Sequence, residues 1–355
     1  MESNFLDARV LVVGGAGFVG SNLVKLLLES ETKSVTVIDN LLSAERSNLP
    51  DNSKLIFIQG SISDQLILDK VKDEYEYIFH LATFHGNQSS IHDPLKDHEN
   101  NTLTTLKLFD RIKEFKIVKK VVYSSAGCSV AEKTFDEPEA TEEKEITSIK
   151  HDSPYSISKI IGEFYSVYYF NQHKLQVVRA RFQNVYGPGE VLGAGDWRGT
   201  PATIWRNVTP TFIWKAMHGE ALPLENGGDA SRDFIYVDDI CRGLIACALK
   251  GKPGEVYNIA SGKETTIAKL AKLINAKTGN KTDVQLLPKR SWDNSGKRYG
   301  STKKSEKELG FVAKMDIETG IANTITWTKT NEDKIQSCIN KHLHHLKETT
   351  PAASK

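Results

Sequence analysis

The chain has 355 residues, 39% of them hydrophobic, so it is long enough to build one large domain or two ordinary ones. Its 46 basic and 45 acidic side chains give a formal net charge of +1, which argues against nucleic acids and membrane surfaces as partners. The 4 cysteines lack C-x-x-C spacing, which argues against a metal site and a disulfide framework. The first strand begins by residue 9, and no apolar run reaches the length of a membrane span. We therefore expect a cytoplasmic protein without a signal peptide.

Residues 9–24 combine an apolar run of strand length, three glycines spaced three residues apart, and the start of an amphipathic helix. In such a segment Gly14 allows a tight turn, Gly17 lets the backbone approach a pyrophosphate, and Gly20 lets the helix pack closely on the strand. The pyrophosphate then lies at the positive end of the helix, against its unpaired N–H groups. The segment predicts a dinucleotide site.

A second apolar strand, 34–38, ends in Asp39, about 20 residues beyond Gly20, where an acidic residue binds the ribose 2′-hydroxyl of NAD. A carboxylate would repel the 2′-phosphate of NADP, which normally needs an arginine. No basic residue follows Asp39 directly, although Arg46 lies further along the chain. We therefore predict NAD as the cofactor.

From residue 9 to about 185 the chain alternates between strand-like and helix-like stretches. The predicted strands are Val10–Val13, Val35–Ile38, Leu55–Gln59, Tyr77–Leu81, Val121–Ser124 and Gln176–Arg181, and helical patterns include Leu23–Glu29, Thr102–Phe115 and Ile157–Gln172. This alternation predicts an α/β fold with a Rossmann-type, doubly wound parallel sheet.

The pattern becomes irregular and rich in glycine from about Gly187. Later elements are expected at Thr211–His218, Phe234–Leu249, Ile267–Gly279 and Asp283–Leu287. We assign residues 1–186 to the NAD-binding domain, with later segments returning to it, and 187–330 mainly to a smaller C-terminal α/β lobe that binds substrate. Residues 331–355 form a polar tail that is expected to fray.

Tyr155 and Lys159 lie at positions i and i+4, which places them on one face of a helix that begins after Ser153-Pro154. An ammonium group beside a phenol favours the phenolate and lowers its pKa towards the working pH of a general base. An ordinary exposed Tyr/Lys pair has the same spacing. The dinucleotide segment upstream favours the catalytic interpretation.

Further segments extend this pattern along the chain: residues 79–82 (FHLA), 100–102 (NNT), 122–125 (VYSS), 179–188 (RARFQNVYGP) and 232–239 (RDFIYVDD). Together with the glycine turn and Tyr155/Lys159, they resemble the extended short-chain dehydrogenase/reductases, in the branch of NAD-dependent nucleotide-sugar epimerases and dehydratases such as UDP-glucose 4-epimerase. The resemblance runs from about Arg9 to Trp327, nearly the whole chain.

The resemblance implies a set of site residues. For the cofactor these are Gly14, Gly17, Phe18, Val19, Gly20, Asp39, Asn40, Ile62, Leu81, Ala82, Thr83, Asn101, Tyr155 and Lys159. For a nucleotide-diphosphate sugar they are Asn184, Asn207, Val208, Arg232, Arg290 and Asp293. The two arginines suit the diphosphate, because each guanidinium group can bind two of its oxygens. His85 follows the fourth predicted strand at the edge where α/β sheets bind ligands, so it either touches substrate or nicotinamide or is hydrogen-bonded within its loop.

The chain departs from the family around the catalytic hydroxyl. If Ala126 is aligned with the alanine that follows the catalytic serine in the family, Ser125 takes the catalytic position, and we prefer this alignment. If the count starts instead from the strand's aromatic residue, Tyr123, the catalytic position falls on Ala126. The aspartate and glutamate that 4,6-dehydratases carry next are missing, so elimination of water lacks its acid and base. Cys128 lies close to the catalytic cysteine of GDP-mannose 3,5-epimerases, although a small buried residue is the simpler interpretation.

These features predict an NAD-dependent nucleotide-sugar epimerase that acts at C4 through a transient 4-keto intermediate, with Tyr155 as base. The alternatives are a 3,5-epimerase assisted by Cys128, a nucleotide-sugar oxidoreductase or decarboxylase, and a non-catalytic NAD-binding regulator. The resemblance also implies a homodimer.

Overall fold

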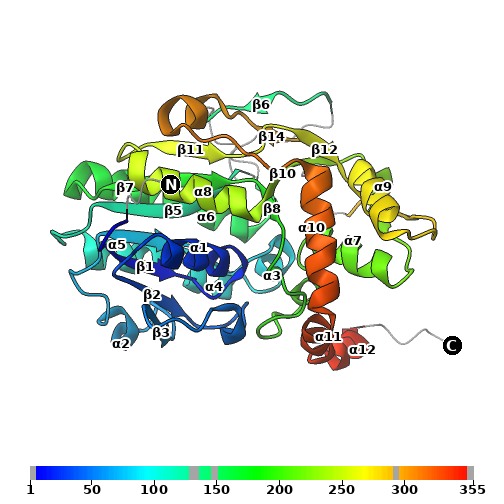
Figure 1. Ribbon diagram of the computed structural model, residues 1–355, viewed down its shortest axis with the longest axis horizontal. Coiled ribbons are helices and arrows are strands. Elements are labelled where there is room, and N and C mark those ends of the chain that lie inside the picture. The colour runs from blue at the N-terminus through cyan, green and yellow to red at the C-terminus, as the bar shows by residue number, and fades with distance from the viewer. Residues whose placement is uncertain (1–4, 128–135, 145–150, 291–295, 350–355) are drawn as a thin grey trace.

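A parallel sheet of 7 strands forms the centre of the molecule, in the order β11-β7-β5-β4-β1-β2-β3 (Figure 1). The computed structural model describes residues 5–127, 136–144, 151–290 and 296–349. The strands are β1 (Arg9–Val13), β2 (Ser34–Asp39), β3 (Leu55–Gln59), β4 (Tyr77–His80), β5 (Lys120–Ala126), β7 (Val177–Phe182) and β11 (Val256–Ile259). The predicted doubly wound parallel sheet is confirmed.

The strand order reverses direction between β1 and β4, and this point opens a crevice at the carboxyl edge of the sheet. Val13, the last residue of β1, pairs with Ile38 on one side and His80 on the other. The ends of the three strands are therefore level. The segments that follow them meet at one edge.

Side chains of the central strands alternate between two buried layers, as expected for a sheet covered on both faces. Val10 and Val12 pack with α1 (Phe18–Glu29) and α8 (Val237–Lys250). Leu11 and Val13 face the opposite layer. That layer is formed by α2 (Gln65–Leu68), α5 (Thr104–Ile112) and α6 (Pro154–His173).

The helix predicted over Thr102–Phe115 has a different start in the structure. Two short helices, α3 (Asn87–His92) and α4 (Pro94–Asp97), lead into a π-helical turn at His98–Leu103, and α5 follows directly. Such π-turns are often found at functional sites. This one carries Asn100 and Asn101 close to the loop after β4.

The C-terminal lobe is built around three small sheets and three helices. The sheets pair β8 (Asn184–Tyr186) and β12 (Glu264–Thr266) with β10 (Ser231–Tyr236), β9 (Pro223–Glu225) with β13 (Gln285–Leu287), and β6 (Ala140–Thr141) with β14 (Tyr299–Gly300). The helices are α7 (Val208–Met217), α9 (Ile267–Thr278) and α10 (Ile317–Thr330). The expected element 234–249 divides at Tyr236 into the end of β10 and α8.

The expectation that the chain frays beyond about residue 330 is wrong for 331–349. This segment forms α11 (Glu332–Asn340) and α12 (Leu343–Thr349), which follow α10 at its lower end in Figure 1. Ile335, Cys338 and Ile339 are buried against the long loop between β8 and α7. One apolar face is enough to dock a helix whose other positions are polar.

In the part of the chain that the structure describes, no helix is long and apolar enough to cross a membrane. The described residues also contain no group of three or more His, Cys, Asp or Glu side chains arranged to hold a metal ion.

Candidate active site

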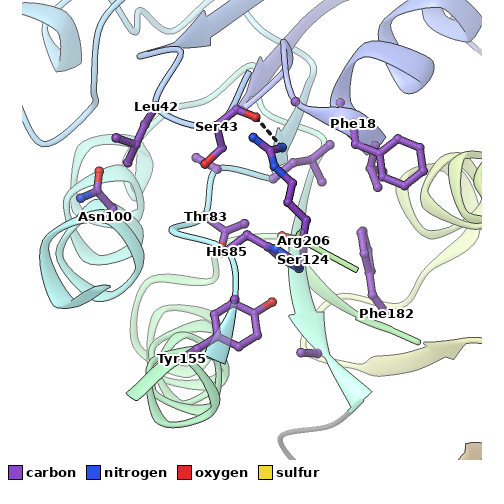
Figure 2. Close-up of a pocket in the computed structure, with 18 of the residues that line it drawn as sticks. Phe18, Leu42, Ser43, Thr83, His85, Asn100, Ser124, Tyr155, Phe182 and Arg206 are labelled. Carbon is purple, nitrogen blue, oxygen red and sulfur yellow. Dashed lines mark hydrogen bonds between the residues drawn. The ribbon is translucent and has the colours of Figure 1, made fainter. Parts of the chain in front are cut away.

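A cavity of about 420 Å³ lies at the carboxyl edge of the sheet, between the sheet and the C-terminal lobe (Figure 2). Predicted residues that line it are Gly14, Gly17, Phe18, Val19, Gly20, Asp39, Asn40, Ile62, Leu81, Ala82, Thr83, His85, Ser125, Tyr155, Lys159, Asn184, Asn207, Arg232 and Arg290. Two predicted residues, Asn101 and Val208, are described but do not line it. Cys128 and Asp293 lie outside the described residues.

The glycine turn after β1 has the backbone geometry that its sequence predicts. Gly14 has φ of 85°, and a Cβ there would lie 2.4 Å from Ala82 N. A Cβ on Gly20 would lie 2.2 Å from Gly14 O, so the helix could not pack so closely on the turn. A Cβ on Gly17 would have Gly14 O, at 3.5 Å, as its nearest neighbour among the described residues. The tightest glycines thus shape the turn, and Gly17 faces the cavity.

The N-terminus of α1 points into the cavity without a side-chain cap within the described structure and without an acidic residue in its first turn. Its first N–H groups and the positive end of the helix are therefore available to an anion. Asp39 stands beside them at the end of β2, where its Oδ2 accepts from Ala16 N at 2.9 Å and its Oδ1 from Leu41 N at 2.8 Å. Burial raises the pKa of Asp39, although the backbone N–H groups oppose that shift. The carboxyl group fixes the glycine turn and lines the cavity.

Asn101 supports the cofactor side of the cavity from behind. Its Oδ1 accepts from Thr83 Oγ1 at 3.0 Å and from Phe84 N at 2.7 Å, and its Nδ2 donates to Asp97 Oδ1 at 2.7 Å. The amide therefore orients the loop after β4. Its neighbour Asn100 lines the cavity instead.

Tyr155 and Lys159 stand one turn apart on α6, which begins at a cap made by Ser153. Lys159 is 4% exposed, and its Nζ donates to the main-chain O of Ser124 at 3.0 Å. This bond holds the ammonium 5.8 Å from the centre of the Tyr155 ring. A fixed cation at that place favours the phenolate form of the tyrosine.

Ser124 and Ser125 both line the cavity, but their hydroxyl protons are directed to protein acceptors. Ser124 Oγ donates to His80 O at 2.9 Å, and Ser125 Oγ donates to Glu163 Oε1 at 2.5 Å. Arg181 pairs with the same carboxylate, with Nε 2.8 Å from Oε1. The lone pairs of the Ser125 oxygen remain for accepting a hydrogen bond from the cavity.

His85 packs edge-on against Tyr155, with ring centres 5.9 Å apart. Figure 2 shows the two side chains next to each other at the cavity. Burial lowers the pKa of His85 to about 3, and the charges of Arg206, Arg198 and Lys159 act in the same direction. The imidazole is therefore neutral at physiological pH. It contributes a hydrogen-bonding ring beside the tyrosine and no charge.

The far end of the cavity is lined by arginines of the C-terminal lobe. Arg232 on β10 donates from Nη1 to Ser231 O at 2.6 Å and to Gly296 O at 2.7 Å. Arg290 forms an ion pair with Glu225 and remains 40% exposed at the side chain. Arg298, which the sequence analysis did not select, lines the same region. These cations can hold a second anionic group.

Three charged residues of the loop between β8 and α7 also line the cavity and were missed: Glu190, Arg198 and Arg206. The available signal was weak, because these residues occur among irregularly spaced glycines with no helical or strand period. Burial raises the pKa of Glu190 to about 7, against the opposing effects of Asn207 and Arg206. Figure 2 shows Arg206 extending across the cavity to the main chain at Ser43.

These residues fit a bound dinucleotide. An open face at Gly17, an uncapped helix end within the described structure and Asp39 lie together. The cavity continues from Ile62, at the end near β3, to Tyr155 on α6. It therefore has room for a pyrophosphate in its middle and carries the Tyr155–Lys159 pair at one end.

Comparison with known proteins agrees with this geometry. Residues 10–260 match the model of the NAD dependent epimerase/dehydratase family. The chain is 29% identical to a putative UDP-glucose 4-epimerase of Methanocaldococcus jannaschii over 91% of this chain and 99% of that protein. It is 61% identical to the crystal structure of the Bordetella bronchiseptica enzyme WbmF with NAD+ and UDP, with a TM-score of 0.87, covering 97% of this chain and 98% of that one.

A Thermotoga maritima UDP-glucose 4-epimerase, solved with UDP-glucose, is 30% identical with a TM-score of 0.82, covering 91% of this chain and 99% of that one. The Bordetella enzyme has also been solved with NADH. The family match spans the glycine turn, Tyr155 and Lys159, and the cavity that joins them fits the same cofactor. The chain belongs to the NAD dependent epimerase/dehydratase family of nucleotide-sugar enzymes, and its cofactor is NAD.

Proposed function

We propose that this protein epimerises a nucleotide-diphosphate sugar at C4 through a 4-keto intermediate, with Tyr155 as the base. The observation that carries this proposal is the Tyr155–Lys159 pair at one end of the NAD cavity, with the lysine fixed by the main chain of Ser124. A tyrosine held beside a buried ammonium is suited to accept a hydroxyl proton at neutral pH.

NAD held at the glycine turn and Asp39 would supply the hydride acceptor for C4 and the hydride that is returned later. Tyr155 takes the proton from the C4 hydroxyl as the ketone forms. Ser125, whose proton is directed to Glu163, accepts a hydrogen bond from the sugar. After the sugar turns, Tyr155 returns the proton to the C4 oxygen. The net change is inversion at C4, and no co-reactant is consumed.

The acidic groups of the cavity favour epimerisation over loss of water. Among the described lining residues, the carboxyl groups are those of Asp39 and Glu190. Asp39 is held by the glycine turn, and Glu190 accepts from Asn207, so both lie on other elements than Tyr155. In sequence, Ser125 is followed by Ala126 and Gly127, where a dehydratase would need its acid and base.

The substrate nucleotide is assigned to the C-terminal lobe. Arg232 and Arg290 would hold its diphosphate, and Asn184 and Asn207 would donate hydrogen bonds to it. In this assignment residues 1–186 mainly bind NAD and residues 187–330 mainly bind the nucleotide sugar. Complexes of similar enzymes with UDP and UDP-glucose support testing UDP-sugars first.

A homodimer forms part of the proposal. Three apolar side chains of α6 are exposed: Ile157 at 46%, Phe164 at 62% and Tyr168 at 52%. Their spacing places them on one face of the helix, away from its contacts with the sheet. A second copy paired through α6 would cover this face. Light scattering should show a dimer, and Phe164→Glu should shift it to monomer.

Tyr155→Phe tests the proposed base directly. The variant removes the hydroxyl and little volume, so NAD binding should be retained while turnover falls about 10²–10⁴-fold. Tyr165→Phe, on the same helix but outside both the cavity and the exposed face, is the matched control and should retain wild-type turnover. Products from UDP-, GDP- and dTDP-sugars would be resolved by NMR. Near-normal turnover in Tyr155→Phe would refute the proposed base.

Running the reaction in D₂O separates C4 epimerisation from the 3,5-epimerase alternative. Internal return of the hydride places no solvent deuterium on carbon, whereas deprotonation beside the ketone does. We expect no carbon-bound deuterium in the product and substantial activity in Cys128→Ala. Incorporation at C3 or C5 that disappears in Cys128→Ala would replace the C4 proposal with cysteine-assisted 3,5-epimerisation.

A further inference from the structure

The loop between β8 and α7 places two arginines, Arg198 and Arg206, in the cavity. Arg198 is 5% exposed, and the Nε atoms of Arg198 and Arg206 are buried without a hydrogen-bond partner among the described residues. Burial lowers the pKa of Arg198 to about 9, and the neighbouring charge of Arg206 adds to that effect. Both guanidinium groups also bond to Ser43, so they lie close together, in a buried region where positive charge is unfavourable without an anion.

The loop that carries these arginines crosses between α1 and the segment after β2. Near its start, Pro188 O accepts from Asn22 Nδ2 on α1 at 3.1 Å. Further along, Arg206 Nη1 donates to Ser43 O at 2.8 Å, and Arg198 Nη1 donates to Ser43 Oγ at 2.9 Å. In this fold the pyrophosphate of a dinucleotide lies at the N-terminus of the first helix, next to the ribose that lies at the end of the second strand.

The C-terminal helices fix this loop in place. His342 Nε2 lies 2.9 Å from Gly193 O, and Lys341 Nζ donates to Glu45 Oε1 at 2.7 Å. A Cβ on Gly193 would lie 2.7 Å from the backbone of Cys338, which shows how closely α11 packs on the loop. The arginines are therefore presented by a supported structure.

The carboxyl groups near Arg198 and Arg206 do not fully neutralise the positive charge of this part of the cavity. Glu190 and Glu45 act on Arg206, and Asp196 acts on Arg198. Glu45 is also engaged by Lys341 and by Gly195 N, so it is shared among several donors. Lys159 adds another buried cation to the cavity. An anionic ligand would complete the charge balance.

We propose that Arg198 and Arg206 bind the pyrophosphate of NAD from the side opposite the glycine turn, so that the loop 188–207 covers the cofactor and slows its release. The glycine turn and the end of α1 supply N–H groups from the sheet side. The two guanidinium groups supply donors from the C-terminal lobe. This arrangement suits an enzyme that reduces and reoxidises one cofactor molecule in each turnover.

The test measures cofactor binding and does not depend on activity. In the NAD-loaded protein, exchange of bound NAD with isotopically labelled NAD would be followed by mass spectrometry. After NAD is removed, calorimetry would give the affinities of ADP, adenosine and UDP. Arg206→Gln and Arg198→Gln should each weaken ADP binding about 10- to 100-fold, the loss expected for charge-assisted hydrogen bonds. NAD exchange should accelerate similarly, with adenosine and UDP affinities unchanged.

Two further variants keep the test decisive. Arg46→Gln removes an exposed arginine from the segment after β2 and should leave ADP binding unchanged. Arg206→Lys, which keeps the charge but loses the fork, should weaken ADP binding about tenfold even if Arg206→Gln does not fold. Unchanged ADP affinity in the folded arginine variants would overturn the proposal. So would weaker binding of UDP with ADP unaffected, which would place the arginines in the nucleotide-sugar site.

Discussion

Replacing Glu163 with glutamine should destabilise the protein strongly, because it removes the counter-ion of buried Arg181 and half-buried Arg179. Glu163 is 5% exposed and binds Arg181 through two bonds, Nε to Oε1 at 2.8 Å and Nη2 to Oε2 at 2.9 Å. Arg179 lies 3.6 Å from the same carboxylate. Burial raises the pKa of Glu163, but Arg181, Ser125 and Arg179 outweigh that effect, so its pKa is lowered and the group is ionised.

The expected magnitude follows from this geometry. Glutamine keeps the volume and one acceptor oxygen, so no cavity forms and the loss is electrostatic. Breaking a buried ion pair by neutralising one partner costs about 3–5 kcal/mol, because the remaining charge is left unpaired in the interior. We expect the free energy of unfolding of Glu163→Gln to fall by about that amount.

The assay is urea unfolding followed by circular dichroism at pH 7, with saturating NAD. Glu142→Gln is the control, because Glu142 also pairs with two cations, Lys144 at 3.0 Å and Lys303 at 3.7 Å, but at the surface. That variant should show no measurable change. Adding Arg181→Met to Glu163→Gln should cost less than Arg181→Met alone, since the pair is already broken. If Glu163→Gln unfolds at the wild-type urea concentration, the buried pair does not stabilise the fold as argued.

Three further predictions concern binding and pH. Asp39→Ala should weaken NAD binding about 10- to 100-fold, because charge-assisted hydrogen bonds are lost. Calorimetry that showed tighter binding of NADP than of NAD by the wild type would contradict the assignment of Asp39 to the ribose 2′-hydroxyl. Arg232→Ala and Arg290→Ala should mainly raise KM in steady-state kinetics, because these arginines would bind the substrate and the transition state equally well. A collapse of kcat at constant KM would contradict this role. Burial and the charge of Lys159 lower the pKa of His80 to about 3, so below pH 6.5 the unfolded chain gains a proton that the folded one does not. His80 should therefore contribute a loss of stability that approaches about 1.4 kcal/mol per pH unit on acidification. In unfolding experiments from pH 7 to pH 5, His80→Gln should reduce the slope of stability against pH by about that amount, and equal slopes would refute the linkage.

The features that indicate NAD binding could be predicted from the sequence, because each of them lies within a short stretch of residues. The strand, the glycine turn, the helix and the next strand follow one another within residues 9–39, so each is visible in a short window. Gly14 and Gly20 are required by contacts that the turn itself creates. The spacing of Tyr155 and Lys159 likewise needs only one helix. The sheet order then follows from repeated strand–helix units.

Other features depended on contacts between distant segments. β11 has only 4 residues and became recognisable through its pairing with β7. The helices beyond residue 330 were unexpected because their average composition is polar. Ile335 and Ile339 form an apolar face only where the loop between β8 and α7 covers it. The hydrophobic periodicity of the segment's own sequence does not reveal such docking.

Arg198 and Arg206 show most clearly what the tertiary structure decided. In sequence they stand among irregularly spaced glycines, where an arginine is most often an exposed charge. The fold brings that loop across the ends of α1 and β2, fixes it with α11 and the turn that follows α11, and turns both guanidinium groups into the cavity. The sequence thus determined which cofactor the protein uses, because that information lies in contiguous residues. Which side chains line the cavity depended on long-range packing, because segments about 150 residues apart meet there.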